Sequence, residues 1–246
     1  MSRILIKIEY VGTNYHGWQK QGDLPTIQGI LEKTLSEFFK QQITLFASGR
    51  TDAKVHAKAQ YAHFDCESRF DYSRLPLAIN TLLPKDIMIV SACEVSEDFH
   101  ARFSVKKKVY RYYIYNNPIR SPLLQEFSLH VPAILNINKM KKACKIFVGE
   151  HDFTAFCSKR EYEDKYLNIR KIYYLKIKKM GDLICFEICG NGFLYNMVRI
   201  IVGTILAVGK NKIQPNQIKN MFESKNRSEA GETLPAQGLV LFDVIY

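Results

Sequence analysis

The sequence lacks the patterns that would mark a secreted, membrane or cofactor-binding protein. Its six cysteines show no C-x-x-C spacing and no small disulfide framework, which indicates reduced thiols in a cytosolic chain. No apolar run reaches the roughly 18 residues of a membrane-spanning helix. No Gly-x-Gly-x-x-Gly or phosphate-cradling loop is present, so nucleotide-cofactor binding has no support and we expect no cofactor or metal. Residues 1–4 lead directly into a strand pattern without a signal or transit peptide, so we expect a cytoplasmic protein.

Acidic residues are in deficit. The chain has 24 Asp plus Glu against 35 Lys plus Arg, a net charge of +11. Such a field attracts polyanions, so nucleic acid is the default partner, although a merely basic cytosolic protein would show the same excess. With 246 residues, of which 47% are hydrophobic, the chain can bury one large core or two moderate ones.

Apolar periodicity predicts alternating strands and helices. A helix capped by Thr26 is expected, as is a helix from Ser73 through Leu82. The other predicted helices span 137–147 and 194–208, and the predicted strands span 4–10, 43–47, 55–64, 87–95, 168–179 and 183–189, with a further strand within 106–115 and a final buried strand near the C-terminus. The order of elements in the first half recurs in the second without any visible sequence repeat.

The stretch 48–57, Ser-Gly-Arg-Thr-Asp-Ala-Lys-Val-His-Ala, joins two of the predicted strands. It carries a cation, Arg50, and a carboxylate, Asp52, two positions apart among small residues that allow backbone and ligand to approach closely. Two interpretations remain open at this point. The stretch is either a functional site or a hairpin turn with a solvated Arg and Asp.

In residues 106–115 a run of three lysines passes directly into a strand rich in tyrosine, including Tyr110. Basic side chains can neutralise phosphates while aromatic rings stack on unpaired bases, at about 1–3 kcal/mol per base. The alternative is a strand with one buried aromatic face and one solvated basic face.

Arg199 is the only charged residue between Ile188 and Gly209. A cation in so apolar a helix needs a carboxylate or phosphate partner, because an unpaired buried charge costs several kcal/mol. That partner is either a structural carboxylate or a catalytic one.

Several spaced motifs together resemble the tRNA pseudouridine synthase A family, nearly from end to end. They are residues 10–12 with 15–19, 48–57, 99–104 with 110–112, 153–156, 193–203 and 235–239. Several motifs in the family's order are far more specific than one short motif. The resemblance implies an α+β fold of two related halves whose mainly antiparallel sheets join across a central RNA-binding cleft, with helices on the outer face. We place the boundary between the halves at about residue 104, giving domains 1–104 and 105–246.

The resemblance also implies the activity and the partners. It implies isomerisation of uridine to pseudouridine in the anticodon stem-loop of tRNA, at tRNA positions 38 to 40, by a cytoplasmic homodimer that acts without a membrane. Two alternatives stay open. One is the same chemistry on another RNA such as ribosomal RNA, and the other is a non-catalytic RNA-binding module that keeps the fold.

Residue by residue, Asp52 falls on the family's catalytic aspartate and Arg50 on the arginine that helps to hold the flipped nucleotide. Tyr110 falls on the tyrosine that stacks on the target base. Arg199 falls on the basic partner of the aspartate, and Leu239 on an apolar wall of the pocket.

Lys54 departs from the family, which usually has glycine two residues after the catalytic aspartate. A left-handed backbone there would cost a lysine about 1–2 kcal/mol. We therefore expect the loop to use an ordinary backbone conformation, and the Lys54 ammonium to bind an RNA phosphate beside the flipped nucleotide.

Overall fold

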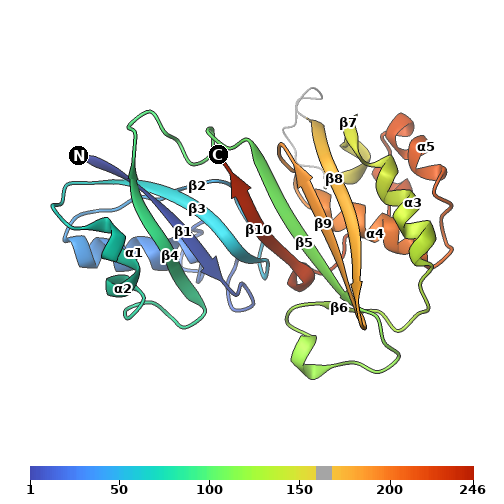
Figure 1. Cartoon of the computed structure of the whole chain (residues 1–246), viewed down its shortest axis with the longest axis horizontal. Coiled ribbons are helices and arrows are strands. Elements are labelled where there is room, and N and C mark those ends of the chain that lie inside the picture. The colour runs from blue at the N-terminus through green and yellow to red at the C-terminus, as the bar shows by residue number, and fades with distance from the viewer. Residues whose placement is uncertain (159–167) are drawn as a thin grey trace. The chain divides into compact units, whose positions relative to one another are not determined.

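The computed structural model describes residues 1–158 and 168–246 and divides the chain into two compact units (Figure 1). Unit 1 comprises Met1–Lys106 with Val240–Tyr246, and unit 2 comprises Lys107–Leu239. Each unit is a mainly antiparallel sheet with its own helices, so the predicted α+β class is confirmed.

Unit 1 has the strand order β4-β1-β3-β10, in which β1 pairs antiparallel with both β3 and β4. The short β2 pairs antiparallel with β3, farther along the strand than β10 does. Its strands are β1 (Ser2–Tyr10), β2 (Phe46–Ala47), β3 (His56–Cys66), β4 (Ile87–Val95) and β10 (Leu239–Ile245), and its helices are α1 (Ile27–Phe39) and α2 (Leu75–Ile79).

The apolar face of β1 forms the core of unit 1. Its alternating isoleucines Ile4, Ile6 and Ile8 are fully buried, as the period of two predicts. Leu31 and Leu35 of α1 are also fully buried. Helix α1 begins where the sequence predicts, because the Thr26 side chain accepts a hydrogen bond of 3.3 Å from the Gly29 N–H.

The final strand, β10, groups with unit 1, although the division at residue 104 left it in the second half. It pairs in parallel with β3 through Val240 and Leu241. The Lys106 N–H donates to the carbonyl of Ile245 at 2.8 Å, and the Tyr246 hydroxyl donates to the carbonyl of Ala101 at 2.8 Å. These pairings are remote in sequence, so the local pattern held no information about them.

Two predicted elements of unit 1 are shorter in the structure. The strand expected over 43–47 is reduced to β2, because side chains of α1 bind the preceding backbone: Ser36 accepts from the Ile43 N–H and Glu32 from the Leu45 N–H. The helix expected through Leu82 ends at Ile79. The side chain of Asn80 forms two hydrogen bonds with the backbone of Ile89 in β4 and so fixes the chain where the helix stops.

Unit 2 has the strand order β5-β9-β8-β7 with antiparallel pairing throughout, and β6 pairs in parallel with β5. Its strands are β5 (Lys107–Tyr115), β6 (Leu129–His130), β7 (Gly149–Asp152), β8 (Ile169–Met180) and β9 (Leu183–Gly190), and its helices are α3 (Ile137–Ile146), α4 (Met197–Gly209) and α5 (Gln217–Ser224).

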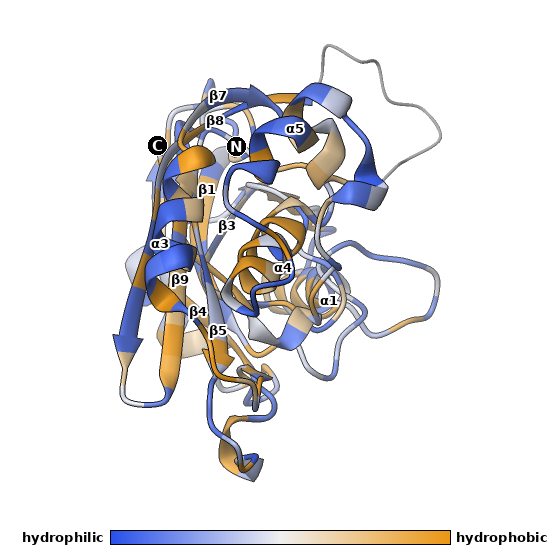
Figure 2. Cartoon of the chain, turned by 90° about the vertical axis from the view of Figure 1, so that its right-hand side faces the viewer, coloured by the Kyte–Doolittle hydropathy of each residue, from blue (hydrophilic) through white to orange (hydrophobic). Residues whose placement is uncertain are grey.

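Helix α4 is the buried centre of unit 2. Eleven of its 13 residues are buried, and Figure 2 shows it as an almost uniformly hydrophobic helix, whereas α3 and α5 alternate. The sequence predicted a single apolar stripe beginning at Leu194, but the helix begins at Met197 and is apolar on nearly all sides. A helix of this kind lies inside a core rather than on its surface.

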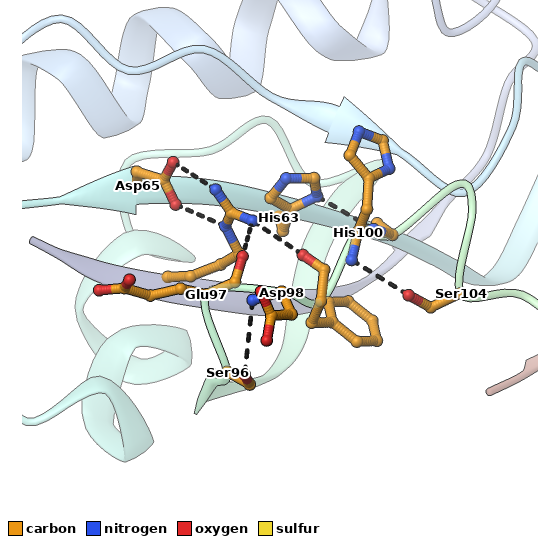
Figure 3. Close-up of polar contacts among 10 residues, drawn as sticks. His63, Asp65, Ser96, Glu97, Asp98, His100 and Ser104 are labelled. Atoms are coloured by element: carbon orange, nitrogen blue, oxygen red, sulfur yellow. Dashed lines mark hydrogen bonds and ion pairs between the residues drawn. The ribbon is translucent and has the colours of Figure 1, made fainter.

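His63 on β3 is a buried histidine that connects this strand to the loop after β4 (Figure 3). Its Nδ1 accepts a hydrogen bond of 3.1 Å from the Ala101 N–H, so that nitrogen carries no proton. Burial, together with the nearby His100 and Arg3, lowers the pKa of His63 to about 4, against opposing effects of Asp65 and of a hydrogen bond with the Phe46 backbone. The imidazole is therefore neutral in the folded chain near neutral pH.

We predict that His63 makes unit 1 less stable in acid. Because its pKa is below 6.5 in the folded chain, the unfolded chain binds the proton first, and the free energy of unfolding falls as the pH drops from about 6.5 towards about 4. Denaturant unfolding of the parent and of His63→Gln across this range should show a shallower decline for the variant. His16→Gln, at an exposed position of the same unit, is the control. Parallel curves for the parent and His63→Gln would contradict the assignment.

Candidate active site

The loop that joins β2 to β3, residues 48–55, begins at a buried polar contact. Ser48 is fully buried, and its hydroxyl donates to the side-chain oxygen of Gln60 at 2.6 Å. The amide of Gln60 donates to the carbonyl of Gly49 at 2.8 Å. Gln60 is itself fully buried on β3, so the strand fixes the first residues of the loop.

A second loop, residues 11–18, holds the middle of the 48–55 loop. The Trp18 N–H donates to the carbonyl of Thr51 at 3.0 Å, and the Lys54 N–H donates to the carbonyl of Tyr15 at 3.3 Å. The buried hydroxyls of Tyr10 and Thr51 lie 2.7 Å apart. Thr51 and Lys54, which lie on either side of Asp52 in the chain, are thus both hydrogen-bonded to residues 10–18.

Two glycines allow the loops to approach this closely. A Cβ at Gly17, where φ is +89°, would lie 2.6 Å from the carbonyl oxygen of Thr51. A Cβ at Gly12 would lie 2.1 Å from the carbonyl oxygen of Val55. The Gly12 N–H also donates to Nδ1 of the buried His56 at 3.0 Å. Local sequence does not indicate this close approach, because only the neighbours of the two glycines in space require it.

Asp52 opens a tight turn. The Val55 N–H donates to the carbonyl of Asp52 at 3.2 Å, which closes a four-residue turn with Lys54 in its third position. Asp52 is half-buried, while Arg50 and Lys54 are exposed. The turn therefore presents one carboxylate between two cationic side chains on the same short segment.

The expectation of an ordinary backbone at Lys54 is wrong. Its φ is +65°, in the left-handed region. The third position of such a turn favours glycine because a residue with a Cβ is strained at positive φ. Position 54 therefore has the backbone conformation that favours glycine, and the chain bears the strain of a lysine there.

Tyr110, on β5 of unit 2, is half-buried, and its ring lies edge-to-face with that of Phe193 at 5.2 Å between centroids. Two residues later, Tyr112 is fully buried and its hydroxyl donates to the carbonyl of Pro235 at 2.8 Å. Gly238 lies against the Tyr112 ring so closely that a Cβ there would be 2.7 Å from Cζ. Strand β5 thus positions both the ring of Tyr110 and the segment that leads to Leu239.

Arg199 lies in the first turn of α4 and is half-buried. Its Nε donates to the carbonyl of Leu234 at 2.6 Å, and one terminal nitrogen donates to the side-chain oxygen of Asn196 at 2.7 Å. Asn196 itself has a left-handed backbone with φ of 60°, and its amide donates to the hydroxyl of Ser158 at 2.9 Å. The bonds from Arg199 to Leu234 and to Asn196 fix the direction of the guanidinium.

Leu239 is 6% exposed and follows a single helical turn, Ala236–Gly238. The segment before it runs against α4 at a pair of glycines. A Cβ at Gly203 would lie 2.1 Å from the carbonyl oxygen of Glu232, and one at Gly231 would lie 2.3 Å from the N of Thr204. Helix α4 therefore positions Arg199 directly and Leu239 through this close contact.

The structure places the predicted site residues in two groups. Arg50, Asp52 and Lys54 share one turn of unit 1. Tyr110, Arg199 and Leu239 belong to unit 2, where β5, α4 and the segment 234–238 connect them. Among residues 1–158 and 168–246, no group of His, Cys, Asp or Glu side chains is arranged to hold a metal ion.

Comparison with known proteins decides the family. A family model described as tRNA pseudouridine synthase matches residues 6–104 and 143–246. The chain belongs to the tRNA pseudouridine synthase family. Proteins named tRNA pseudouridine synthase A from Caldicellulosiruptor saccharolyticus and Anoxybacillus flavithermus are each 46% identical to it, over 246 and 248 residues, covering 100% of this chain and 100% and 99% of theirs. That of Brevibacillus brevis is 42% identical over 247 residues, with 100% of each chain covered.

The family resemblance predicted from the spaced motifs is therefore confirmed. Within the part of the chain that is described, no helix is long and apolar enough to cross a membrane.

We predict that Gly17→Ala disrupts the Asp52 loop. The added methyl group would meet the Thr51 carbonyl at 2.6 Å, so the two loops must separate. Gly22→Ala is a matched control, because Gly22 also has positive φ, of 48°, but has no atom within 4 Å of the added Cβ. Gly17→Ala should lower the melting temperature and the activity well beyond the control. Equal effects of the two substitutions would show that backbone strain alone, rather than loop contact, matters at Gly17.

Proposed function

We propose that this chain converts uridine to pseudouridine in the anticodon stem-loop of tRNA, at tRNA positions 38 to 40, with Asp52 as the catalytic carboxylate. The observation that carries the proposal is the turn that presents Asp52 between Arg50 and Lys54, in a chain that aligns over its whole length with a relative named tRNA pseudouridine synthase A. The enzyme is an isomerase, since substrate and product have the same atoms. We also propose a homodimer, which the resemblance implies, and a cytoplasmic location, which the resemblance and the cysteine pattern favour.

The reaction exchanges one glycosidic bond for another. The bond between N1 of uracil and C1′ of ribose breaks, the base turns, and a bond forms between C1′ and C5. C5 loses a proton and N1 gains one, so the isomerisation is redox-neutral and needs no electron carrier. A carboxylate can act as the nucleophile at C1′ or at C6, or assist loss of the base through a glycal. Asp52 is half-buried, which leaves it able to meet a substrate atom.

The other predicted residues supply binding. The target base has to leave the stacked stem, at a cost of a few kcal/mol, before its atoms can be reached. Tyr110 would stack on the extruded base, and Leu239 would form an apolar wall beside it. Arg50 would hold the flipped nucleotide, and Arg199 has the position that the resemblance implies for the basic partner of the aspartate.

The positive charge supports an RNA substrate. The net charge of +11 attracts a polyphosphate, and Lys106 and Lys107 are exposed where unit 1 leads into β5. Cationic contacts of this kind position an RNA without reading its sequence. They favour RNA over a small uridine nucleotide as the substrate.

We predict that Asp52→Asn abolishes isomerisation and leaves tRNA affinity within about tenfold, which is about 1.4 kcal/mol. The amide keeps the size of the side chain but removes the charge on which attack depends. Unmodified tRNA and, separately, ribosomal RNA are incubated with the parent, with Asp52→Asn, and with Asp23→Asn, which removes a charge from an exposed loop of the same unit.

Mapping of pseudouridine should show product in the tRNA anticodon stem-loop for the parent and for Asp23→Asn only. Turnover by Asp52→Asn within tenfold of the parent would remove Asp52 from the chemistry. Product in ribosomal RNA but not in tRNA would replace the substrate assignment, and binding without product in either RNA would favour a non-catalytic module.

We predict that Lys54→Gly stabilises the chain by about 1 kcal/mol while weakening RNA binding. Glycine removes the strain at φ of 65°, but the ammonium that would bind a phosphate is lost. Lys40→Gly is the matched control, since Lys40 is also an exposed lysine in unit 1 with φ of 55°. Both variants should gain stability, and only Lys54→Gly should show a smaller salt dependence of RNA affinity, by about one phosphate contact. Identical salt slopes for the two variants would refute the phosphate contact.

A further inference from the structure

The loop that follows β4, residues 96–104, carries a solvent-exposed ring next to a cation. Phe103 is 75% exposed, and the guanidinium of the exposed Arg102 lies 5.7 Å from the centroid of its ring. Single exposed apolar side chains are common and need no explanation. What distinguishes Phe103 is the loop that holds it.

Arg3 fixes the first part of this loop (Figure 3). One terminal nitrogen of its guanidinium donates to the carbonyls of Glu97 and Phe99, the latter at 3.0 Å. Its Nε and other terminal nitrogen each bind a carboxylate oxygen of Asp65 on β3 at 2.8 Å. The bidentate pair lowers the pKa of Asp65 and keeps the guanidinium in one orientation. The loop is therefore tied through Arg3 to the middle of the sheet.

Ala101 fixes the second part from both sides. Its N–H donates to the neutral Nδ1 of His63, and its carbonyl accepts from the Tyr246 hydroxyl at 2.8 Å. Ala101 is fully buried, and His63 is 2% exposed. Both main-chain polar groups of this residue are thus satisfied by side chains from β3 and from the end of the chain.

The tip of the loop is closed by its own polar groups. The His100 N–H donates to the Ser104 hydroxyl at 3.1 Å, as Figure 3 shows, and the Ser104 N–H returns to the His100 carbonyl at 2.9 Å. The Arg102 N–H donates to Nδ1 of His100 at 3.1 Å. Phe103 therefore projects from a segment whose backbone is fixed immediately before and after it.

The ring of Phe103 is the outermost of a row of rings. Its centroid lies 4.4 Å from that of His100, which in turn lies 5.8 Å from that of Phe46, itself 48% exposed. Phe46 stacks on His63 at 5.2 Å. The row leads from the buried His63 to water, and the loop's carboxylates, Glu97 and Asp98, interact electrostatically with Arg3.

We propose that Phe103, with Arg102 beside it, is a stacking surface for an unpaired base of the RNA substrate. A ring held by a preorganised loop loses little conformational freedom on binding. Every base offers a π face, and an adjacent cation binds the phosphate that accompanies it. This inference rests on the proposed function, because RNA is the substrate that brings unpaired bases to unit 1.

A second copy of this chain is the rival occupant. The charge of the segment argues against it, because the exposed Arg102 and Lys106 of unit 1 would meet the same charges on the copy. RNA phosphates meet these cations with the opposite sign. If RNA is the occupant, Phe103 should affect the binding of unpaired RNA more than that of duplex RNA. If a second copy is the occupant, Phe103 should affect the association state of the protein.

Affinities are measured for Phe103→Ala, Phe103→Trp and Leu77→Ala with an unmodified tRNA transcript, a single-stranded oligoribonucleotide and a fully paired RNA duplex of the same length. Leu77 is the matched control, since it is 78% exposed in the same unit. Phe103→Ala should weaken binding of tRNA and of the single strand about tenfold or more, and binding of the duplex less than twofold. Phe103→Trp should bind as the parent does, because it keeps an aromatic face.

Equal losses for duplex and single strand, failure of tryptophan to restore binding, or a change in sedimentation of Phe103→Ala would each overturn the proposal. The proposed function is judged separately, from pseudouridine formation by the parent. If the parent forms product and Phe103→Ala binds all RNAs as the parent does, only the stacking surface fails. If the parent forms no product in tRNA, the proposed function fails, while the comparison between single strand and duplex still decides the role of Phe103.

Discussion

The contact between the loops 11–18 and 48–55 is the constraint on which the candidate site depends. The 48–55 segment has no strand ladder of its own between β2 and β3, so its backbone groups are satisfied by Trp18, Tyr15 and Gln60. Such bonds require main-chain atoms to approach within hydrogen-bonding distance, and glycine at 12 and 17 is what leaves room for them. The position of Asp52 is thus set by backbone contacts, with the buried Trp18 beneath them.

Unit 2 also depends on close approach of backbone segments at glycines. The segment leading to Leu239 approaches α4 at Gly203 and Gly231, and approaches the ring of Tyr112 at Gly238. Arg199 then donates to the carbonyl of Leu234 in that segment. The apolar helix α4 carries this cation at its first turn, where the Leu234 carbonyl and the Asn196 side-chain oxygen accept hydrogen bonds from the guanidinium. These bonds avoid the cost of leaving buried donors unsatisfied.

Lys54 shows the limit of this arrangement. The turn after Asp52 is closed by the Val55 N–H and held by the Tyr15 carbonyl, and its third residue, Lys54, has a positive φ of 65°. A lysine there is strained by about 1–2 kcal/mol, an amount that a well-packed loop can impose. In return, the lysine places a cation two residues from Asp52, where we propose that an RNA phosphate binds.

Local pattern in the sequence determined the strands at β1 and β4, the Thr26 cap, and the motifs that carry Asp52, Tyr110 and Arg199, because side-chain period, capping and residue type are properties of neighbours along the chain. Tertiary structure alone decided that β10 joins the first unit, that α4 is buried on nearly all sides, and that Lys54 has a left-handed backbone. It also decided the roles of Gly12, Gly17 and His63. Each of these depends on a partner remote in sequence, and a local pattern does not specify which distant backbone will come within hydrogen-bonding distance.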